Sequence, residues 1–238
     1  MNISKKHIYF ALILLIFIVS SCSEEYPFED QSGVPEIRPG AMYAKDFPTG
    51  SGTEWTYVSL VDGFSYTSTV AGNKNLGGYA VRIMEADANI PVNHIGALYG
   101  FPVYHSFFTK DTDSYVEHGF ELWLDYVQDT FFQRNSPKRM LWSFPLYEGK
   151  EWEVSTSRTV PQFTYTRKVV SANNRVEVPA GVYDNVYYIE EYLSIADMSD
   201  ERDILNKFWV ASGVGVVKYE FVDSELDTTQ VYELAKFK

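Results

Sequence analysis

A tryptophan flanked by two acidic residues forms the segment with the clearest chemical potential. In "HGFELWLDYV" (118–127), Glu121, Trp123 and Asp125 stand at alternate positions. If the segment is a β-strand, alternate side chains lie on one face, so these three residues share a surface. An exposed tryptophan between carboxylates could stack against a sugar ring and bind a glycan. The alternative is a tryptophan that another part of the sheet covers.

The spacing of the acidic residues does not favour a glycosidase. Four strand residues span about 13 Å, whereas the two carboxyl groups of a glycosidase lie roughly 5–9.5 Å apart. The neighbouring pair Glu190 and Glu191 would face opposite sides of a strand. We therefore expect no catalytic carboxylate pair from Glu121 and Asp125 or from these two glutamates.

Other catalytic and metal-binding patterns fail on residue type or spacing. His94, His105 and His118 lack the i, i+2 or i, i+4 spacing that would bring zinc ligands together. The run "KDTDSYV" (110–116) lacks the third oxygen ligand and the glycine of a calcium loop, so it is read as a solvated turn. No G-x-S-x-G string exists, and "GNKNLGG" (72–78) has no G-K-[ST] ending. We expect no enzyme, no metal and no cofactor.

The only cysteine, Cys22, follows an apolar run. Residues 8–19 are continuously apolar and would rise about 18 Å as a helix, which is too short for a bilayer core of roughly 30 Å. Residues 19–22 read V-S-S-C and resemble the lipobox of bacterial lipoproteins. That resemblance implies that residues 1–21 are a signal peptide and that Cys22 is acylated. The alternative is an ordinary secretory signal with a chance cysteine.

The residues after the cysteine predict a location. Ser23, Glu24 and Glu25 resemble the export signal of Bacteroidetes surface lipoproteins, which implies a lipid anchor on the outer face of the outer membrane. The alternative is a solvated acidic linker. Residues 22–42 are rich in proline, glycine and acids, so we expect an acylated cysteine and a flexible tether. A single β domain with two related halves is expected over residues 43–238.

Composition limits the partners. The net charge of −12 argues against nucleic acid as a partner. Once Cys22 is acylated, no thiol remains for disulfides, metal binding or nucleophilic catalysis. The expected partners are the outer membrane, through the lipid anchor, and an apolar ligand, a glycan or a protein.

Strand patterns dominate the folded part. Runs rich in Val, Tyr, Phe, Thr and Trp predict strands at 54–61, 78–85, 120–127, 163–170, 185–193, 216–222 and 230–237. Turn residues separate them, including those at 61–64, 71–78, 171–175 and 183–185. Only residues 195–208 could hold a helix, with Ser199 as its N-cap. The predicted fold is all-β, an antiparallel half-barrel or open barrel with at most one short helix.

One sequence pattern occurs twice. "FPTGSGTEW" (47–55) and "FPLYEGKEW" (144–152) both read F-P-x-x-x-G-x-E-W. A proline in a bend, a glycine in a turn and then a strand that carries a tryptophan would form one structural unit. We expect Trp55 and Trp152 to be buried at equivalent places in two halves of the sheet.

Two further stretches resemble a group of uncharacterised secreted bacterial lipoproteins. The residues are "VEVPAGVYDNVYYIEEY" (176–192) and "FWVASGVGVVKYEF" (208–221), together with "FPLYEGKEW". The resemblance implies an antiparallel half-barrel like that of the LolA-type lipoprotein carriers. These motifs are structural, so they imply a fold and no activity.

The sequence supports one leading function and two alternatives. The leading interpretation is a surface-anchored lipoprotein without catalysis that binds an apolar ligand or a partner in the concave face of its sheet. The second is an accessory subunit of an outer-membrane assembly, which an exposed apolar patch would favour. The third is a protein that binds or degrades polysaccharide, which a cleft with two convergent carboxylates would favour.

Overall fold

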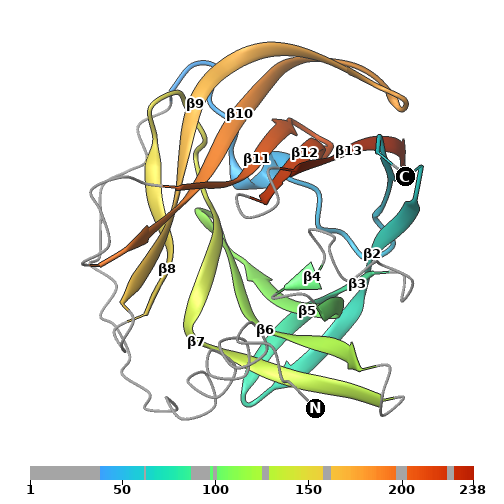
Figure 1. The fold of residues 1–238 in the computed structure, drawn as a ribbon, viewed down its shortest axis with the longest axis vertical. Coiled ribbons are helices and arrows are strands. Elements are labelled where there is room, and N and C mark those ends of the chain that lie inside the picture. The colour runs from blue at the N-terminus through green and yellow to red at the C-terminus, as the bar shows by residue number, and fades with distance from the viewer. Residues whose placement is uncertain are drawn as a thin grey trace, which may run out of the picture. The chain divides into compact units, whose positions relative to one another are not determined.

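The computed structural model describes residues 38–61, 63–86, 97–98, 101–124, 129–157, 162–196, 203–223 and 228–238. All of them belong to one compact unit, Arg38–Lys238. The described residues of this unit form a single sheet of thirteen antiparallel strands (Figure 1) and one short 3-10 helix, η1 (Ala44–Asp46). Among the described residues, no helix has the length and apolarity needed to cross a bilayer. The predicted all-β fold is confirmed.

The sheet consists of two six-stranded meanders. The first contains β1 (Glu54–Ser59), β2 (Ser65–Leu76), β3 (Tyr79–Ala86), β5 (Phe101–Lys110), β6 (Ser114–Leu124) and β7 (Asp129–Ser143). The second contains β8 (Glu151–Ser157), β9 (Phe163–Val178), β10 (Gly181–Ile195), β11 (Asp203–Ala211), β12 (Gly215–Asp223) and β13 (Thr228–Phe237). The short strand β4 (Ala97–Leu98) pairs with β5 alone. The meanders join where β1 pairs with β13, and β7 and β8 remain as the two ends of the sheet.

The repeated sequence builds the same turn at the start of both meanders. Gly52 and Gly149 have φ of 84° and 86°, a left-handed conformation that favours glycine. The N–H of Gly52 donates to the carbonyl of Val70 in β2 at 2.8 Å, and the N–H of Gly149 donates to the carbonyl of Val169 in β9 at 2.9 Å. The two segments differ at their first peptide bond, because the bond between residues 144 and 145 is cis.

The tryptophans that follow these turns are both buried, as the sequence predicted. Trp55 is 4% exposed and Trp152 is 8% exposed. Each is the second residue of its strand, and each indole N–H donates to a backbone carbonyl, that of Val214 at 2.6 Å or of Met140 at 3.2 Å. The repeated sequence therefore forms the same local structure, a glycine turn and a buried tryptophan, at both places.

The core lies inside the curve of the sheet (Figure 1), and half of its buried residues are aromatic. Strand β1 alternates between half-buried and buried residues, which places Trp55 and Tyr57 inside. The segment before β1 also packs into the core, because Met42 and Phe47 are 1% and 6% exposed. Phe47 and Phe144, the first residues of the two repeats, lie edge to face with ring centroids 5.9 Å apart.

Several local predictions were wrong. Residues 203–208 belong to β11, so the predicted helix at 195–208 does not form there, and Ser199 lies outside the described residues. Residues 171–175 and 183–185, predicted as turns, lie within β9 and β10. Asn173 and Asn185 have positive φ there, and the strand register shifts near both, so these turn-like residues form bulges within long strands. In the predicted turn at 71–78, only Gly77 and Gly78 leave the strands.

Candidate functional site

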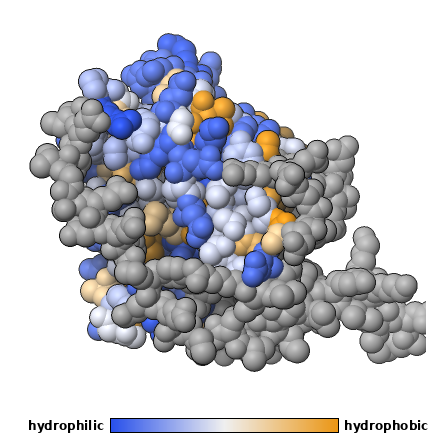
Figure 2. Space-filling view, turned by 90° about the vertical axis from the view of Figure 1, so that its left-hand side faces the viewer, coloured by the Kyte–Doolittle hydropathy of each residue, from blue (hydrophilic) through white to orange (hydrophobic). Residues whose placement is uncertain are grey.

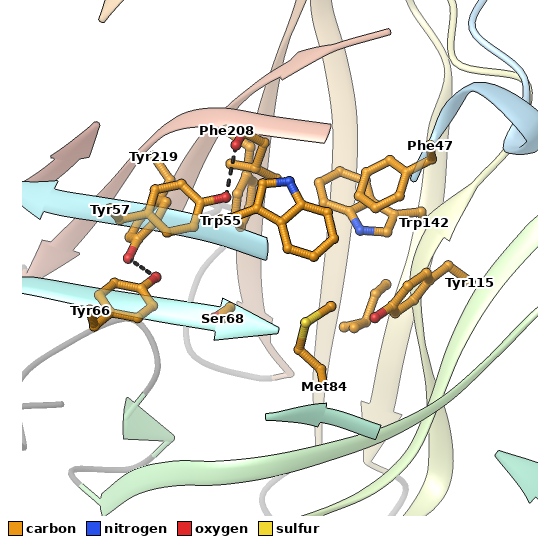
Figure 3. A pocket seen from close by; sticks show the side chains of 12 residues that line it. Phe47, Trp55, Tyr57, Tyr66, Ser68, Met84, Tyr115, Trp142, Phe208 and Tyr219 are labelled. Carbon is orange, nitrogen blue, oxygen red and sulfur yellow. Dashed lines mark hydrogen bonds between the residues drawn. The ribbon is translucent and has the colours of Figure 1, made fainter. Parts of the chain in front are cut away.

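The concave face contains a cavity of about 210 Å³ (Figure 3). Strands of both meanders and the segment before β1 contribute to its wall. The lining residues are Phe47, Trp55, Tyr57, Tyr66, Ser68, Met84, Tyr115, Leu141, Trp142, Phe208, Val216 and Tyr219. Eight of these twelve residues are aromatic, so the wall is predominantly apolar and rigid.

Tyrosines at one side of the cavity bond to the protein itself. The hydroxyl of Tyr57 donates to the carbonyl of Val216 at 2.8 Å, and the hydroxyls of Tyr66 and Tyr219 share a hydrogen bond. The Tyr57 and Tyr66 rings stack with centroids 5.4 Å apart. Burial raises the pKa of all three tyrosines, so this side of the cavity carries no charge at neutral pH.

Three other lining residues carry polar groups that do not bond to the described part of the protein. The side chains of Ser68, Tyr115 and Trp142 form no hydrogen bond with the described residues. Tyr115 and Trp142 are 4% and 6% exposed, so protein surrounds nearly all of each side chain. The hydroxyl of Tyr115 points into the cavity (Figure 3).

A buried ion pair lies behind the aromatic wall. The Nε of Arg167 donates to the Glu191 carboxylate at 2.7 Å, and Asn206 donates to the same carboxylate at 2.6 Å. The guanidinium lies 4.7 Å from the Trp142 ring centroid and 4.4 Å from that of Phe208. Arg167 thus packs against two rings that also line the cavity.

The charges of this pair depend on each other. Burial lowers the pKa of Arg167, and the attraction of Glu191 opposes that shift. Burial alone would raise the pKa of Glu191, but the positive charges of Arg167 and Arg139 outweigh it and hold the pKa below its usual value. Both groups are therefore charged at neutral pH, and each neutralises the other.

The two meanders differ at the place where the cavity forms. Trp55 pairs with Ser68 across β1 and β2, just as Trp152 pairs with Arg167 across β8 and β9. Ser68 in turn pairs with Ala86, whereas Arg167 pairs with Glu191. In the first meander, two small residues thus occupy the positions that the second meander fills with a buried ion pair. The smaller side chains leave space, and this explains why the cavity lies beside Ser68.

The ends of the sheet are held together by side chains. The indole N–H of Trp152 in β8 donates to the carbonyl of Met140 in β7, and the Nη1 of Arg167 donates to the neighbouring carbonyl of Leu141. These bonds replace part of the backbone pairing that joins β1 to β13. Leu141 lines the cavity, so this closure also supports the cavity wall.

Of the residues predicted as a glycan platform, Glu121 is not among the described residues that line this cavity. Glu121 lies in β6, where its carboxylate bonds to the Nδ1 of His105 at 2.6 Å and to the Nζ of Lys74 at 3.3 Å. Burial opposes ionisation of Glu121, but these two partners outweigh it and lower its pKa. Trp123 pairs with Thr130 in the sheet, and Asp125 lies outside the described residues. The platform stays a prediction.

Some of the remaining predicted residues lie outside the described ones, namely Cys22, residues 23–25 after it, and His94. Within the described ranges, no group of three or more His, Cys, Asp or Glu side chains could hold a metal ion. His118 is 5% exposed and hydrogen-bonds to the hydroxyl of Thr109 at 2.9 Å.

Sequence reasoning missed the cavity residues Ser68 and Tyr115, and it missed Arg167. Arg167 could have been noticed, because it is a basic residue within the predicted strand at 163–170, the strand that follows the tryptophan of the second repeat. Aligning the two repeats without a gap sets Ser68 against Tyr165, so the equivalence of Ser68 and Arg167 emerges only from the strand pairing. No local pattern distinguishes Tyr115, whose role depends on pairing with Trp142 across β6 and β7.

Comparisons with known proteins give two solved structures. No family model and no curated protein matches the chain. One structure is of a candidate lipoprotein from Parabacteroides distasonis, with 15% identity and a TM-score of 0.36. Another is of a candidate exported protein with a YmcC-like fold from Bacteroides fragilis, with 13% identity and a TM-score of 0.38. Each alignment covers 83% of this chain and 99% of the other chain. Neither is described as a LolA-type carrier, so that likeness stays a prediction.

Proposed function

We propose that the protein is a lipid-anchored lipoprotein of the outer membrane surface that binds a small apolar molecule in the aromatic cavity and catalyses no reaction. The observation that carries the proposal is the cavity itself, because the described residues of its wall are mostly aromatic and none of them is charged. A mostly apolar wall favours an apolar occupant, because filling the cavity with one removes apolar surface from water.

The volume sets the size of the ligand. Binding pockets for drug-sized molecules measure about 300–1,000 Å³, and this cavity measures about 210 Å³. An engineered apolar cavity of about 150 Å³ is large enough for benzene. The cavity therefore suits one substituted ring or the end of an aliphatic chain rather than a whole lipid.

The buried carboxylates support the absence of catalysis. Glu191 is held by Arg167 and Asn206. Glu117 accepts hydrogen bonds from Ser106 at 2.6 Å and from Asn135 at 2.9 Å, and it pairs with Arg139. Carboxylates that are fixed in this way are poorly suited to give or take protons from a substrate.

The surface gives less support to an accessory subunit. On the side that faces the viewer in Figure 2, the coloured residues are mostly hydrophilic and the apolar patches among them are small and separate. The described large apolar residues that are exposed are Leu60, Val61, Tyr79, Phe132, Val170 and Val182. The pair Leu60 and Val61 lies at the turn after β1, and a stable interface needs a much larger apolar patch.

Filling the cavity tests the proposed function. Ser68→Phe should place a ring in the space beside Trp55, and Ser65→Phe, at an exposed position of the same strand, is the control. Ethylbenzene at about 100 times its Kd should stabilise the wild type by about 2.7 kcal/mol, or roughly 5–11 °C in Tm. The shift should persist in Ser65→Phe and disappear in Ser68→Phe. An equal shift in both variants would locate binding elsewhere and refute the proposal.

A further inference from the structure

Polar groups in an apolar cavity show what kind of molecule the cavity suits. The Tyr115 hydroxyl and the Trp142 indole N–H have no hydrogen-bond partner among the described residues, although both side chains are more than nine-tenths buried. In the described part of the chain, the enclosed side-chain atoms without a partner are instead Thr166 Oγ1 and Asn206 Oδ1, so the two donor atoms remain accessible from the cavity that they line. A ligand that fills the cavity would remove these donors from water, and this costs free energy unless the ligand supplies an acceptor. An aromatic wall with two unpaired donors is therefore adapted to more than a hydrocarbon.

The two donors belong to neighbouring residues whose rings are held by packing. Tyr115 and Trp142 are direct partners across β6 and β7. The Tyr115 ring stacks on Phe108 with centroids 4.3 Å apart and an interplanar angle of 11°. Both residues also contact Phe47, with ring centroids at 6.0 Å for Tyr115 and 5.5 Å for Trp142. Neighbouring rings thus fix both donors without using their polar atoms.

The chemistry of these groups selects an oxygen acceptor. An indole N–H can only donate, and a phenol can donate or accept. Burial raises the pKa of Tyr115, so its hydroxyl keeps its proton at neutral pH. One oxygen atom with two lone pairs, in a carbonyl or a hydroxyl group, can accept from both donors.

The charges around the cavity favour a neutral ligand. The described lining residues include no lysine, arginine or histidine. Arg167 lies behind Trp142, but its charge is paired with Glu191. A carboxylate would enter an apolar site without a counter-ion, and such burial is costly.

We propose that the cavity binds a neutral, ring-sized molecule whose single carbonyl or hydroxyl oxygen accepts hydrogen bonds from Tyr115 and Trp142. This inference rests on the proposed function and specifies its ligand class. Ser68 leaves the space for the ring, and its hydroxyl is a further group that can bond to a polar substituent.

Three probes of similar size test the proposal. Ethylbenzene has no oxygen, acetophenone has a carbonyl, and benzoate has a carboxylate. Binding is measured from the quenching of tryptophan fluorescence and from Tm. Wild-type protein should bind acetophenone about tenfold more tightly than Tyr115→Phe does, because this variant cannot form one of the two hydrogen bonds to the ligand oxygen. Ethylbenzene should bind both proteins equally.

The control variant removes a hydroxyl outside the cavity. Tyr187 is 5% exposed, and its hydroxyl donates to the carbonyl of Gly40. Tyr187→Phe should bind acetophenone as the wild type does. This control separates the loss of a specific hydrogen bond from a general effect of removing a buried hydroxyl.

Each result bears on the proposal differently. If Tyr115→Phe binds acetophenone as tightly as the wild type, the oxygen-acceptor inference is wrong, whereas the apolar site stands if ethylbenzene still binds. If benzoate binds more tightly than acetophenone, the ligand is not neutral and the inference also fails. If none of the three probes binds, both the inference and the proposed function are wrong.

Discussion

Removing either repeated tryptophan should destabilise the protein strongly and by a similar amount. A buried aromatic side chain covers about 150–250 Å², which at about 25 cal/mol per Å² corresponds to roughly 4–6 kcal/mol. Trp55 and Trp152 are 4% and 8% exposed, so each has nearly this full value. Measured aromatic-to-alanine changes cost about 3–5 kcal/mol, and the carbonyl that loses its indole donor adds about 1 kcal/mol.

We therefore expect Trp55→Ala and Trp152→Ala each to lower the free energy of unfolding by about 4–5 kcal/mol, a large share of the roughly 5–15 kcal/mol available to a domain. Tm should fall by about 8–20 °C. The measurement is urea unfolding followed by circular dichroism. Trp209 is a matched control, because it is half-buried and stacks on Tyr188 with centroids 5.0 Å apart.

Trp209→Ala should cost less than half as much as either repeated tryptophan. The reasoning fails if one of the two repeated positions tolerates alanine as well as Trp209 does. It also fails if the effects of Trp55→Ala and Trp152→Ala on the free energy of unfolding differ by more than about 2 kcal/mol. Such a difference would mean that the two turns and their buried rings are not energetically equivalent.

Three further predictions concern the anchor, the buried ion pair and the glycan platform. Cys22→Ser should abolish incorporation of labelled palmitate, and unchanged labelling would contradict the lipid anchor. Alanine at residues 23–25 should leave the protein lipidated but shielded from protease on intact cells, and unchanged cleavage would contradict the export signal. Glu191→Gln should cost about 3–5 kcal/mol by leaving Arg167 buried without a counter-charge, whereas changing both residues to Met should cost less. Because the folded-state pKa of Glu191 is lowered, its contribution is present above the unfolded value of about 4.3 and is lost as pH falls below it, so Glu191→Gln should flatten acid unfolding curves in that range. Trp123→Ala should weaken glycan binding with little change in Tm, and a large loss of stability would exclude an exposed platform.

The fold could be predicted because alternation and β-branched or aromatic content report directly on strands. Val216 to Val222 and Gln230 to Phe237 are strands in the structure as predicted. The helix prediction at 195–208 failed because polar residues such as Asn206 and Lys207 interrupt the strand pattern. Those side chains are explained by cross-strand partners, Glu191 and Glu220, that are distant in sequence.

The candidate site was much harder to predict than the fold. The cavity depends on strand register, which brings Trp55 beside Ser68 and Tyr115 beside Trp142. It also depends on a difference between two meanders that share a turn sequence, with Ser68 where the other has Arg167. Local patterns indicate which residues face inward, but they do not show where the inward-facing side chains fail to fill the space.

The most direct test of the account is a crystal structure of the protein purified from its native membrane, compared with the same structure after soaking in acetophenone. The account predicts density in the cavity between Trp55 and Tyr115, with an oxygen atom within hydrogen-bonding distance of the Tyr115 hydroxyl. A cavity that collapses, so that its own side chains fill the space and no probe density appears, would contradict the claim that this protein binds a small molecule there.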